Sequence, residues 1–150
     1  MADNKPIEIK IDNKEVLTRL QELASRGENL RPLMKNIAGI MATATEDNFK
    51  NEGRPDKWVD LSETTKNQRQ KIGKYPGQIL QVSGQLASSV STAYDDNSAV
   101  IGLNLAYAAI HQLGGQAGKN KKTTIPARPY LKLTDDNFEE IFDEINKFLE

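Results

Sequence analysis

The residue best suited to acid–base chemistry is His111, the only histidine in the 150-residue chain. A histidine beside a serine and an aspartate can serve as the base of a hydrolase, but such enzymes usually present the nucleophile in a short, recognisable motif. The patterns G-x-S-x-G, G-x-x-x-x-G-K-[ST] and H-E-x-x-H are all missing from the sequence. Since His111 follows the apolar Tyr107, Ala108 and Ile110, a packed structural histidine is favoured, and we expect no enzymatic activity.

Metal and cofactor chemistry is equally constrained by the residue types. The chain has no cysteine and one histidine, which excludes disulfides, thiolate nucleophiles, cysteine-based zinc or iron–sulfur sites and any site with two histidine ligands. The acidic pairs Asp95-Asp96, Asp135-Asp136 and Glu139-Glu140 fall in a turn or near a helix start, where acids more often cap and solubilise than catalyse. We therefore expect no metal, no cofactor and no small-molecule substrate.

Two further side chains are candidates for binding. Arg128 lies between Pro126 and Pro129, so the backbone is stiff there and the guanidinium can clamp a carboxylate, either of this chain or of a neighbour. Trp58 is the only tryptophan and is favoured as an anchor for the loop after a long helix.

Charge is segregated along the chain, although the net charge is only −1. Residues 112–132 contain five basic residues and no acid, whereas residues 134–150 contain seven acids and only Lys147 as a base. One interpretation is an acidic amphipathic helix beside a solvated loop. The other is a protein with one basic and one acidic surface, suited to head-to-tail contacts or to facing DNA. Lys119, Lys121 and Lys122 could contact phosphates, but no interleaved aromatic residues offer a base-stacking platform.

The hydrophobic pattern predicts the elements that position these residues. Alternation of Ile7, Ile9 and Ile11 predicts a short strand, and Asp12 or Asn13 can cap the helix that follows. Apolar residues spaced by three and four from Leu30 to Phe49 predict a long central helix. Ser62 is the candidate cap of a polar helix that ends at Gly73.

The second half of the chain changes character. Residues 90–103 predict a β-hairpin and residues 106–113 a short helix. Residues 116–124 show no periodicity and are expected to form a mobile loop, followed by an extended segment 125–131. Thr134 should cap an amphipathic C-terminal helix.

We therefore predict an α+β fold in one domain over residues 1–150. A small antiparallel sheet with a β-hairpin is packed by the long central helix and the C-terminal helix. No secretory signal and no apolar run long enough to cross a membrane are visible, so a soluble protein without membrane contact is expected.

Three blocks of sequence resemble the phage virion morphogenesis family, the tail-completion proteins of Mu-like and related tailed phages. The first is Trp58-Val59-Asp60-Leu61 with the basic stretch to Gly73, and the second runs from Ile79 to Val90. The third joins Tyr-Ala-x-x-His-Gln-x-Gly-Gly at residues 107–115 to Ile-Pro-Ala-Arg-Pro-Tyr-Leu at residues 125–131. The resemblance covers about residues 30–150, and Gln85 departs from it where a basic residue is expected.

The resemblance implies a structural role in phage assembly. Such proteins act at the neck or the head-proximal end of the tail, and comparable proteins form rings, often hexameric, around the DNA channel. The implied partners are other copies of the chain, phage neck and tail proteins and genomic DNA, first in the host cytoplasm and then in the virion. The implied assembly residues are Trp58, Tyr107, His111, Gln112, Arg128 and Tyr130, with Lys119, Lys121 and Lys122 facing DNA or a partner.

Two alternatives to this role stay open at the level of sequence. One is a capsid morphogenesis factor that acts on heads and is not retained in the virion. The other is an accessory protein that binds DNA through its lysine-rich loop.

Overall fold

The spine of the molecule is α2 (Arg31–Lys50), as the apolar spacing predicts. It is 20 residues long, or about 30 Å at 1.5 Å per residue, and Pro32 lies in its first turn, where no backbone N–H is required. The computed structural model describes residues 13–81, 83–105 and 107–149. The strand predicted at residues 7–11 lies outside these described residues.

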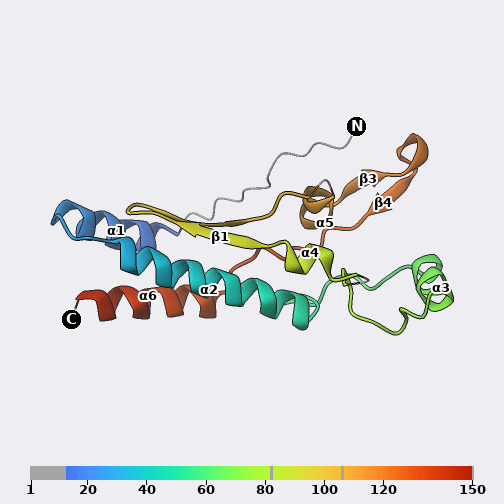
Figure 1. Cartoon of the computed structure of the whole chain (residues 1–150), viewed down its shortest axis with the longest axis horizontal. Helices are drawn as coiled ribbons and strands as arrows, with labels where there is room; N and C mark the ends of the chain where they lie inside the picture. The colour runs from blue at the N-terminus through green and yellow to red at the C-terminus, as the bar shows by residue number, and fades with distance from the viewer. Residues whose placement is uncertain (1–12, 82, 106, 150) are drawn as a thin grey trace.

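Two helices pack beside the first half of α2. α1 (Lys14–Ser25) is capped by Asn13, whose side chain accepts the N–H of Val16 at 3.1 Å. α6 (Asp135–Leu149) lies alongside α2 and also contacts α1 (Figure 1). The predicted cap Thr134 is confirmed, since its hydroxyl accepts the N–H of Asn137 at 3.4 Å. Leu23, Leu33, Ile37, Ile141 and Ile145 form the centre of this first hydrophobic cluster.

The predicted β-hairpin is confirmed and packs on α2. β1 (Ser91–Tyr94) pairs antiparallel with β2 (Ala99–Gly102), with Tyr94 opposite Ala99. The side chain of Asp95 organises the turn by accepting the N–H groups of Asn97 and Ser98, each at 2.7 Å. Both strands contact α2, so the helix supports the sheet along much of its length.

Three short helices accompany the three sequence blocks described above. α3 (Glu63–Lys71) begins at the predicted cap Ser62, and α4 (Gln85–Ser88) is a single turn before β1. α5 (Ala108–Leu113) is the predicted short helix, closed by Gly114. A second hydrophobic cluster joins Leu86 of α4 and Ala108 of α5 to Phe49, Trp58, Tyr130 and Leu131.

The segment 116–124 is not an irregular loop, so its predicted secondary structure is wrong. β3 (Gly115–Ala117) pairs antiparallel with β4 (Thr123–Ile125), and the 3-10 turn η1 (Lys119–Lys121) joins them. Figure 1 shows this hairpin projecting from α5, at the end of the molecule away from α1 and α6. The fold is therefore α+β as predicted, with two separate two-stranded sheets among the described residues.

Candidate functional site

The motif residues converge on the extended segment after β4, at the C-terminal end of α2. Tyr130 is fully buried, and its ring stacks on Phe49 with 5.3 Å between the ring centroids. Trp58 packs edge-on against Phe49, with 5.8 Å between the ring centroids, and its indole N–H donates to the carbonyl of Pro129 at 3.1 Å. Residues far apart in the sequence thus build one aromatic core.

Side-chain amides hold the backbone of this extended segment from two sides. The side-chain oxygen of Gln112 in α5 accepts the N–H groups of Tyr130 and Leu131 at 3.0 and 2.9 Å. On the other side, the amide nitrogen of Asn48 in α2 donates to the carbonyls of Tyr130 and Lys132 at 2.7 and 2.9 Å. The segment is therefore tied to α2 and α5 as a strand is tied to its neighbours, but by side chains.

Arg128 binds backbone carbonyls of its own chain. Its Nε donates to the carbonyl of Val59 at 2.9 Å and its Nη2 to that of Asp60 at 3.0 Å. Among the described residues the guanidinium thus binds two carbonyls and no carboxylate, and it fixes the loop between Trp58 and α3. Binding of a neighbour's carboxylate stays a prediction. Burial, followed by the nearby charge of Arg69, lowers the pKa of Arg128, while the charge of Asp60 opposes that shift.

His111 is half-buried between Tyr107 and the Arg128 segment. Its ring lies edge-on to that of Tyr107 at 5.9 Å, and its carbonyl accepts the N–H of Arg128 at 2.8 Å. Burial, helped by the Arg128 charge, lowers the pKa of the His111 imidazole below its usual 6.5. A lowered pKa favours the neutral form of the ring, which fits the structural interpretation.

The structure explains why the first glycine of the Gly-Gly pair in the third motif, Gly114, has no side chain. Its φ of +76° lies in the left-handed region, and an added Cβ would sit 2.8 Å from the backbone nitrogen of Ala127. A residue with a side chain would push α5 away from the segment that leads to Arg128.

These positions decide which predicted residues can meet a partner. Four of the predicted residues are buried, namely Trp58, Gln112, Arg128 and Tyr130. In the isolated chain they therefore support the surface from beneath and contribute little exposed area to it. The accessible side chains beside them are Tyr107, Val59 and Leu113, which are 39, 61 and 67% exposed. The sequence reasoning missed Val59 and Leu113, although exposed apolar residues inside a motif are a signal for contact.

A second group that the sequence reasoning missed is a buried polar cluster. Asn48, Asn137 and the guanidinium of Arg54 meet between α2 and α6: the Arg54 Nε donates to the Asn48 side-chain oxygen at 3.0 Å, and its Nη2 donates to that of Asn137 at 3.3 Å. Asn48 falls on the apolar stripe of α2, and a polar residue in such a stripe signals a specific hydrogen-bonded role.

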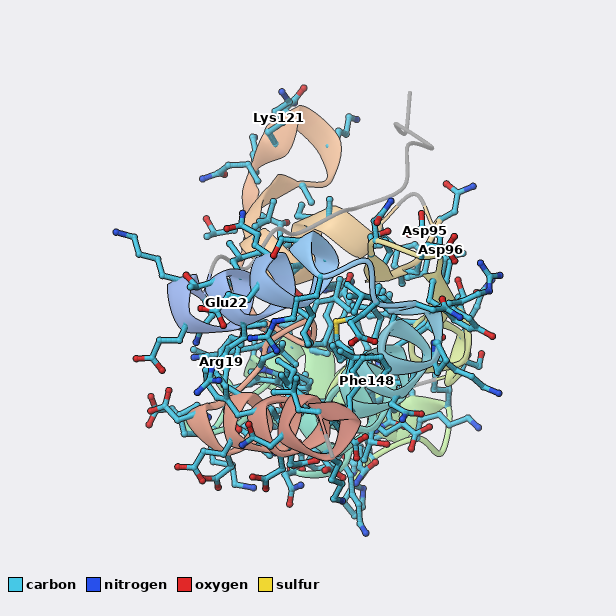
Figure 2. All side chains as sticks on the ribbon, turned by 90° about the vertical axis from the view of Figure 1, so that its left-hand side faces the viewer. Arg19, Glu22, Asp95, Asp96, Lys121 and Phe148 are labelled. Carbon is cyan, nitrogen blue, oxygen red and sulfur yellow. The ribbon has the colours of Figure 1, made fainter. Side chains whose placement is uncertain are left out.

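The lysine-rich hairpin is a basic protrusion. Lys119, Lys121 and Lys122 are all exposed at its tip, and none forms an ion pair with a described residue. Figure 2 shows Lys121 pointing outward at the edge of the molecule opposite α6. We refer to these three residues as the basic tip.

The exposed side of α6 is the acidic counterpart. Asp135, Asp136, Glu139, Glu140 and Asp143 are exposed, and none of these five forms an ion pair with a described residue. We refer to them as the acidic face. The basic tip and α6 lie on opposite sides of the molecule, with Lys121 at one edge and α6 at the other (Figure 2).

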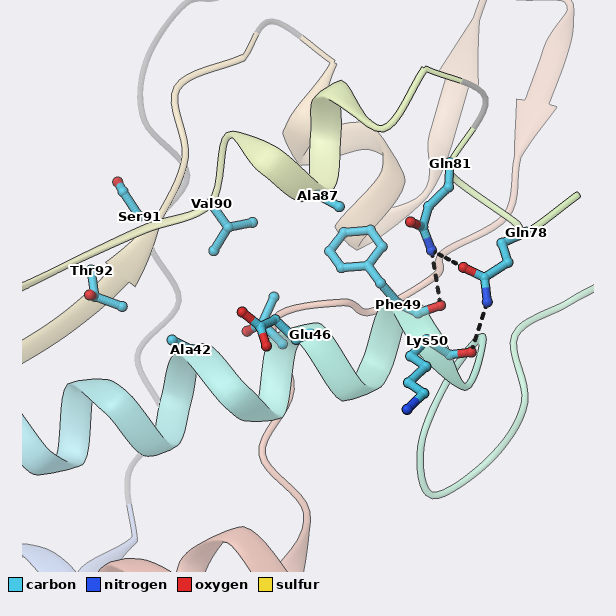
Figure 3. A pocket seen from close by; sticks show the side chains of 11 residues that line it. Ala42, Glu46, Phe49, Lys50, Gln78, Gln81, Ala87, Val90, Ser91 and Thr92 are labelled. Atoms are coloured by element: carbon cyan, nitrogen blue, oxygen red, sulfur yellow. Dashed lines mark hydrogen bonds between the residues drawn. The ribbon is translucent and has the colours of Figure 1, made fainter. Parts of the chain in front are cut away.

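A groove of about 450 Å³ lies between α2 and the chain leading into β1 (Figure 3). Gln78 and Gln81 form one wall and donate to the carbonyls of Lys50 and Phe49 at 3.1 and 3.3 Å. They satisfy carbonyls that a helix end leaves free, so this wall supports α2.

In the described residues no cluster of histidine, aspartate and glutamate is arranged to hold a metal. None of the described helices is both long and apolar enough to cross a membrane.

Comparisons with known proteins agree with the motifs. The phage virion morphogenesis family matches residues 11–150. The Mu-like prophage FluMu G protein 2 of Haemophilus influenzae is 39% identical over 145 residues, covering 96% of both chains. The putative capsid assembly protein G of Escherichia phage Mu is 34% identical over 143 residues, covering 93% of this chain and 91% of that protein.

A third relative, the Mu-like prophage FluMu G protein 1 of Haemophilus influenzae, is 36% identical over 147 residues, covering 95% of this chain and 94% of that protein. No solved structure matches significantly. The extent of the family match and the near-complete coverage of the relatives show that the chain belongs to the phage virion morphogenesis family.

Proposed function

We propose that the chain is a structural assembly protein that forms a ring at the neck or the head-proximal end of the tail and completes the tail or joins it to the head. The observation that carries the ring is the separation of the acidic face from the basic tip. A ring uses a heterologous interface, in which one surface of each copy meets a different surface of the next. Opposite charges on two sides of one molecule, neither of them paired with a described residue, supply such a pair of surfaces.

Apolar contact would add to this electrostatic pairing. Val59, Leu113 and Tyr107 expose apolar surface around the buried Arg128, and the buried core of an interface is usually apolar with a polar rim. In this proposal Arg128, Gln112, Trp58 and Tyr130 fix the shape of the contact surface from beneath. The role requires no catalytic residue and no cofactor.

Charge reversal tests the pairing directly. We expect Lys119→Glu, Lys121→Glu and Lys122→Glu together to abolish self-association, and Glu139→Lys, Glu140→Lys and Asp143→Lys together to do the same. Combining both sets in one chain should restore association, since the attraction returns with its signs exchanged. Native mass spectrometry at low salt, where surface charges are least screened, gives the ring size, such as a hexamer.

A control reverses the same number of charges elsewhere. Lys14, Arg19 and Arg26 are exposed, and their change to Glu should leave association intact. A chain that stays monomeric at high concentration, and also in the presence of neck and tail components, contradicts the ring.

The name of the phage Mu relative favours a second candidate, a capsid morphogenesis factor that acts on heads in the host cytoplasm and leaves before the virion is complete. Mass spectrometry of purified particles separates the two roles, because a tail-completion protein must be present in them.

The exposed basic tip favours a third candidate, contact with genomic DNA. Binding through three lysines would weaken steeply with salt. If changing Lys119, Lys121 and Lys122 to Ala leaves DNA affinity unchanged, this candidate is wrong.

A further inference from the structure

An apolar groove lies on the far side of β2 from β1. It has a volume of about 330 Å³ and is walled by α1, α2, β2 and α6, whereas no residue of β1 lines it. The side chains that form its floor are largely apolar and include Leu20, Ile37, Met41, Ile101, Leu133 and Phe138. Asn13, the first described residue, also lines it, so the preceding chain starts at the groove itself.

Along the edge of β2 beside this groove, the backbone N–H groups of Ala99 and Ile101 have no hydrogen-bond partner among residues 13–81, 83–105 and 107–149. The N–H of Asp95 donates to the carbonyl of Ser98 at 2.9 Å, which makes that pair a hydrogen-bonded one. Because hydrogen-bonded and non-hydrogen-bonded pairs alternate in an antiparallel ladder, the pairs Ala93–Val100 and Ser91–Gly102 are bonded and the pairs with Ala99 and Ile101 are not. The backbone N–H groups of Ala99 and Ile101 therefore point away from β1.

We propose that residues 7–11 of the same chain occupy this groove as a third strand against β2. Ile7, Ile9 and Ile11 form one apolar face by alternation, with Glu8 and Lys10 on the other. A strand of this kind presents isoleucines to the apolar side chains of the groove, leaves its charged face in water and pairs with the outward-pointing N–H groups of Ala99 and Ile101. Five residues span about 17 Å at 3.3 Å each, enough to follow the four residues of β2.

The same chain is the favoured source of this strand because Asn13 is part of the groove wall. A tether of one or two residues gives a high effective concentration that a segment from another molecule lacks. The added strand would also cover an edge that otherwise invites pairing between molecules. This inference does not depend on the proposed ring, since it concerns a different surface.

Amide hydrogen exchange measured residue by residue tests the proposal on the whole chain. We expect slow exchange at Ala99 and Ile101 in the unmodified protein. Ile9→Asp should speed exchange at both by roughly a hundredfold as the strand edge opens, while Val100 and Gly102, which bond to β1, stay protected. Their protection shows that the variant is folded.

Lys10→Asp is the matched control, because it introduces the same residue on the opposite face and should leave Ala99 and Ile101 protected. Fast exchange at these two amides in the unmodified chain overturns the proposal. So does equal loss of protection in Lys10→Asp, and so does protection that appears only as the protein concentration rises, since that assigns the strand to a second copy.

Discussion

Gln112 and Tyr130 are joined by a hydrogen bond of 3.0 Å from the backbone N–H of Tyr130 to the side-chain oxygen of Gln112, although the whole β3–β4 hairpin separates them in sequence. The amide nitrogen of Gln112 also donates to the carbonyl of Leu131 at 3.4 Å. One side chain thus closes the base of the hairpin. The basic tip is therefore carried on a base that is fixed to the aromatic core.

Gln112→Leu should destabilise the fold markedly. It keeps a side chain of similar size but leaves the N–H groups of Tyr130 and Leu131 buried without a partner, and each unsatisfied group costs about 1–3 kcal/mol. We expect the free energy of unfolding to fall by at least about 2 kcal/mol. Urea unfolding followed by the fluorescence of the single tryptophan measures it. Gln116→Leu, at an exposed position in β3, is the control, and an equal effect of both substitutions contradicts the assigned role.

Tyr130→Phe isolates one hydrogen bond in the aromatic core. The Tyr130 hydroxyl donates to the carbonyl of Ala108 at 2.6 Å, and both residues are buried. Loss of the donor should cost about 1–3 kcal/mol and leave the stacking on Phe49 in place. The matched variant Tyr107→Phe removes a hydroxyl that bonds Gln85 at the surface, and its effect should stay within about 0.5 kcal/mol. Thermal and urea unfolding measure the change in the free energy of unfolding of both variants, and equal changes contradict the role assigned to the Tyr130 hydroxyl.

The sequence predicts the helices and the first hairpin well because burial imposes a period on them. α2 buries a stripe from Leu33 to Phe49, and that stripe is visible in the order of residues. The hairpin at 115–125 escapes the same reasoning, since its residues are exposed or only half-buried and nothing forces its side chains to alternate. The turn of this hairpin does have a signal in the sequence. Gly118 and Asn120 both have positive φ, and glycine and asparagine are residue types that tolerate it.

The candidate site is predictable as a set of positions but not as a set of contacts. The motifs point to Trp58, Gln112, Arg128 and Tyr130, and the structure brings these together. That Arg128 would bind the carbonyls of Val59 and Asp60 follows from tertiary packing, which a sequence pattern does not encode.

Arg128→Lys should weaken the fold although it keeps the charge. A lysine cannot donate to two carbonyls in the fixed directions that the guanidinium uses for Val59 and Asp60. Hydrogen bonds from charged groups contribute about 1.5–3 kcal/mol, so we expect a loss of about 2 kcal/mol and faster exchange of the amides between Trp58 and Ser62. Arg19→Lys, at an exposed position of α1, should change neither quantity. Unchanged stability of Arg128→Lys contradicts the bridging role.

His111 should make the fold sensitive to mild acid. Its pKa is lowered in the folded chain by burial and by the charge of Arg128, whereas in the unfolded chain it is about 6.5. Above pH 6.5 the imidazole is neutral in the folded and in the unfolded chain, so its protonation does not reduce the free energy of unfolding. As the pH falls below 6.5, the unfolded chain takes up the proton first, so the free energy of unfolding should decrease toward pH 5.5. His111→Gln removes this slope if the assignment is right, and the same slope in both proteins, measured by urea unfolding at pH 7.5 and 5.5, assigns it to other groups.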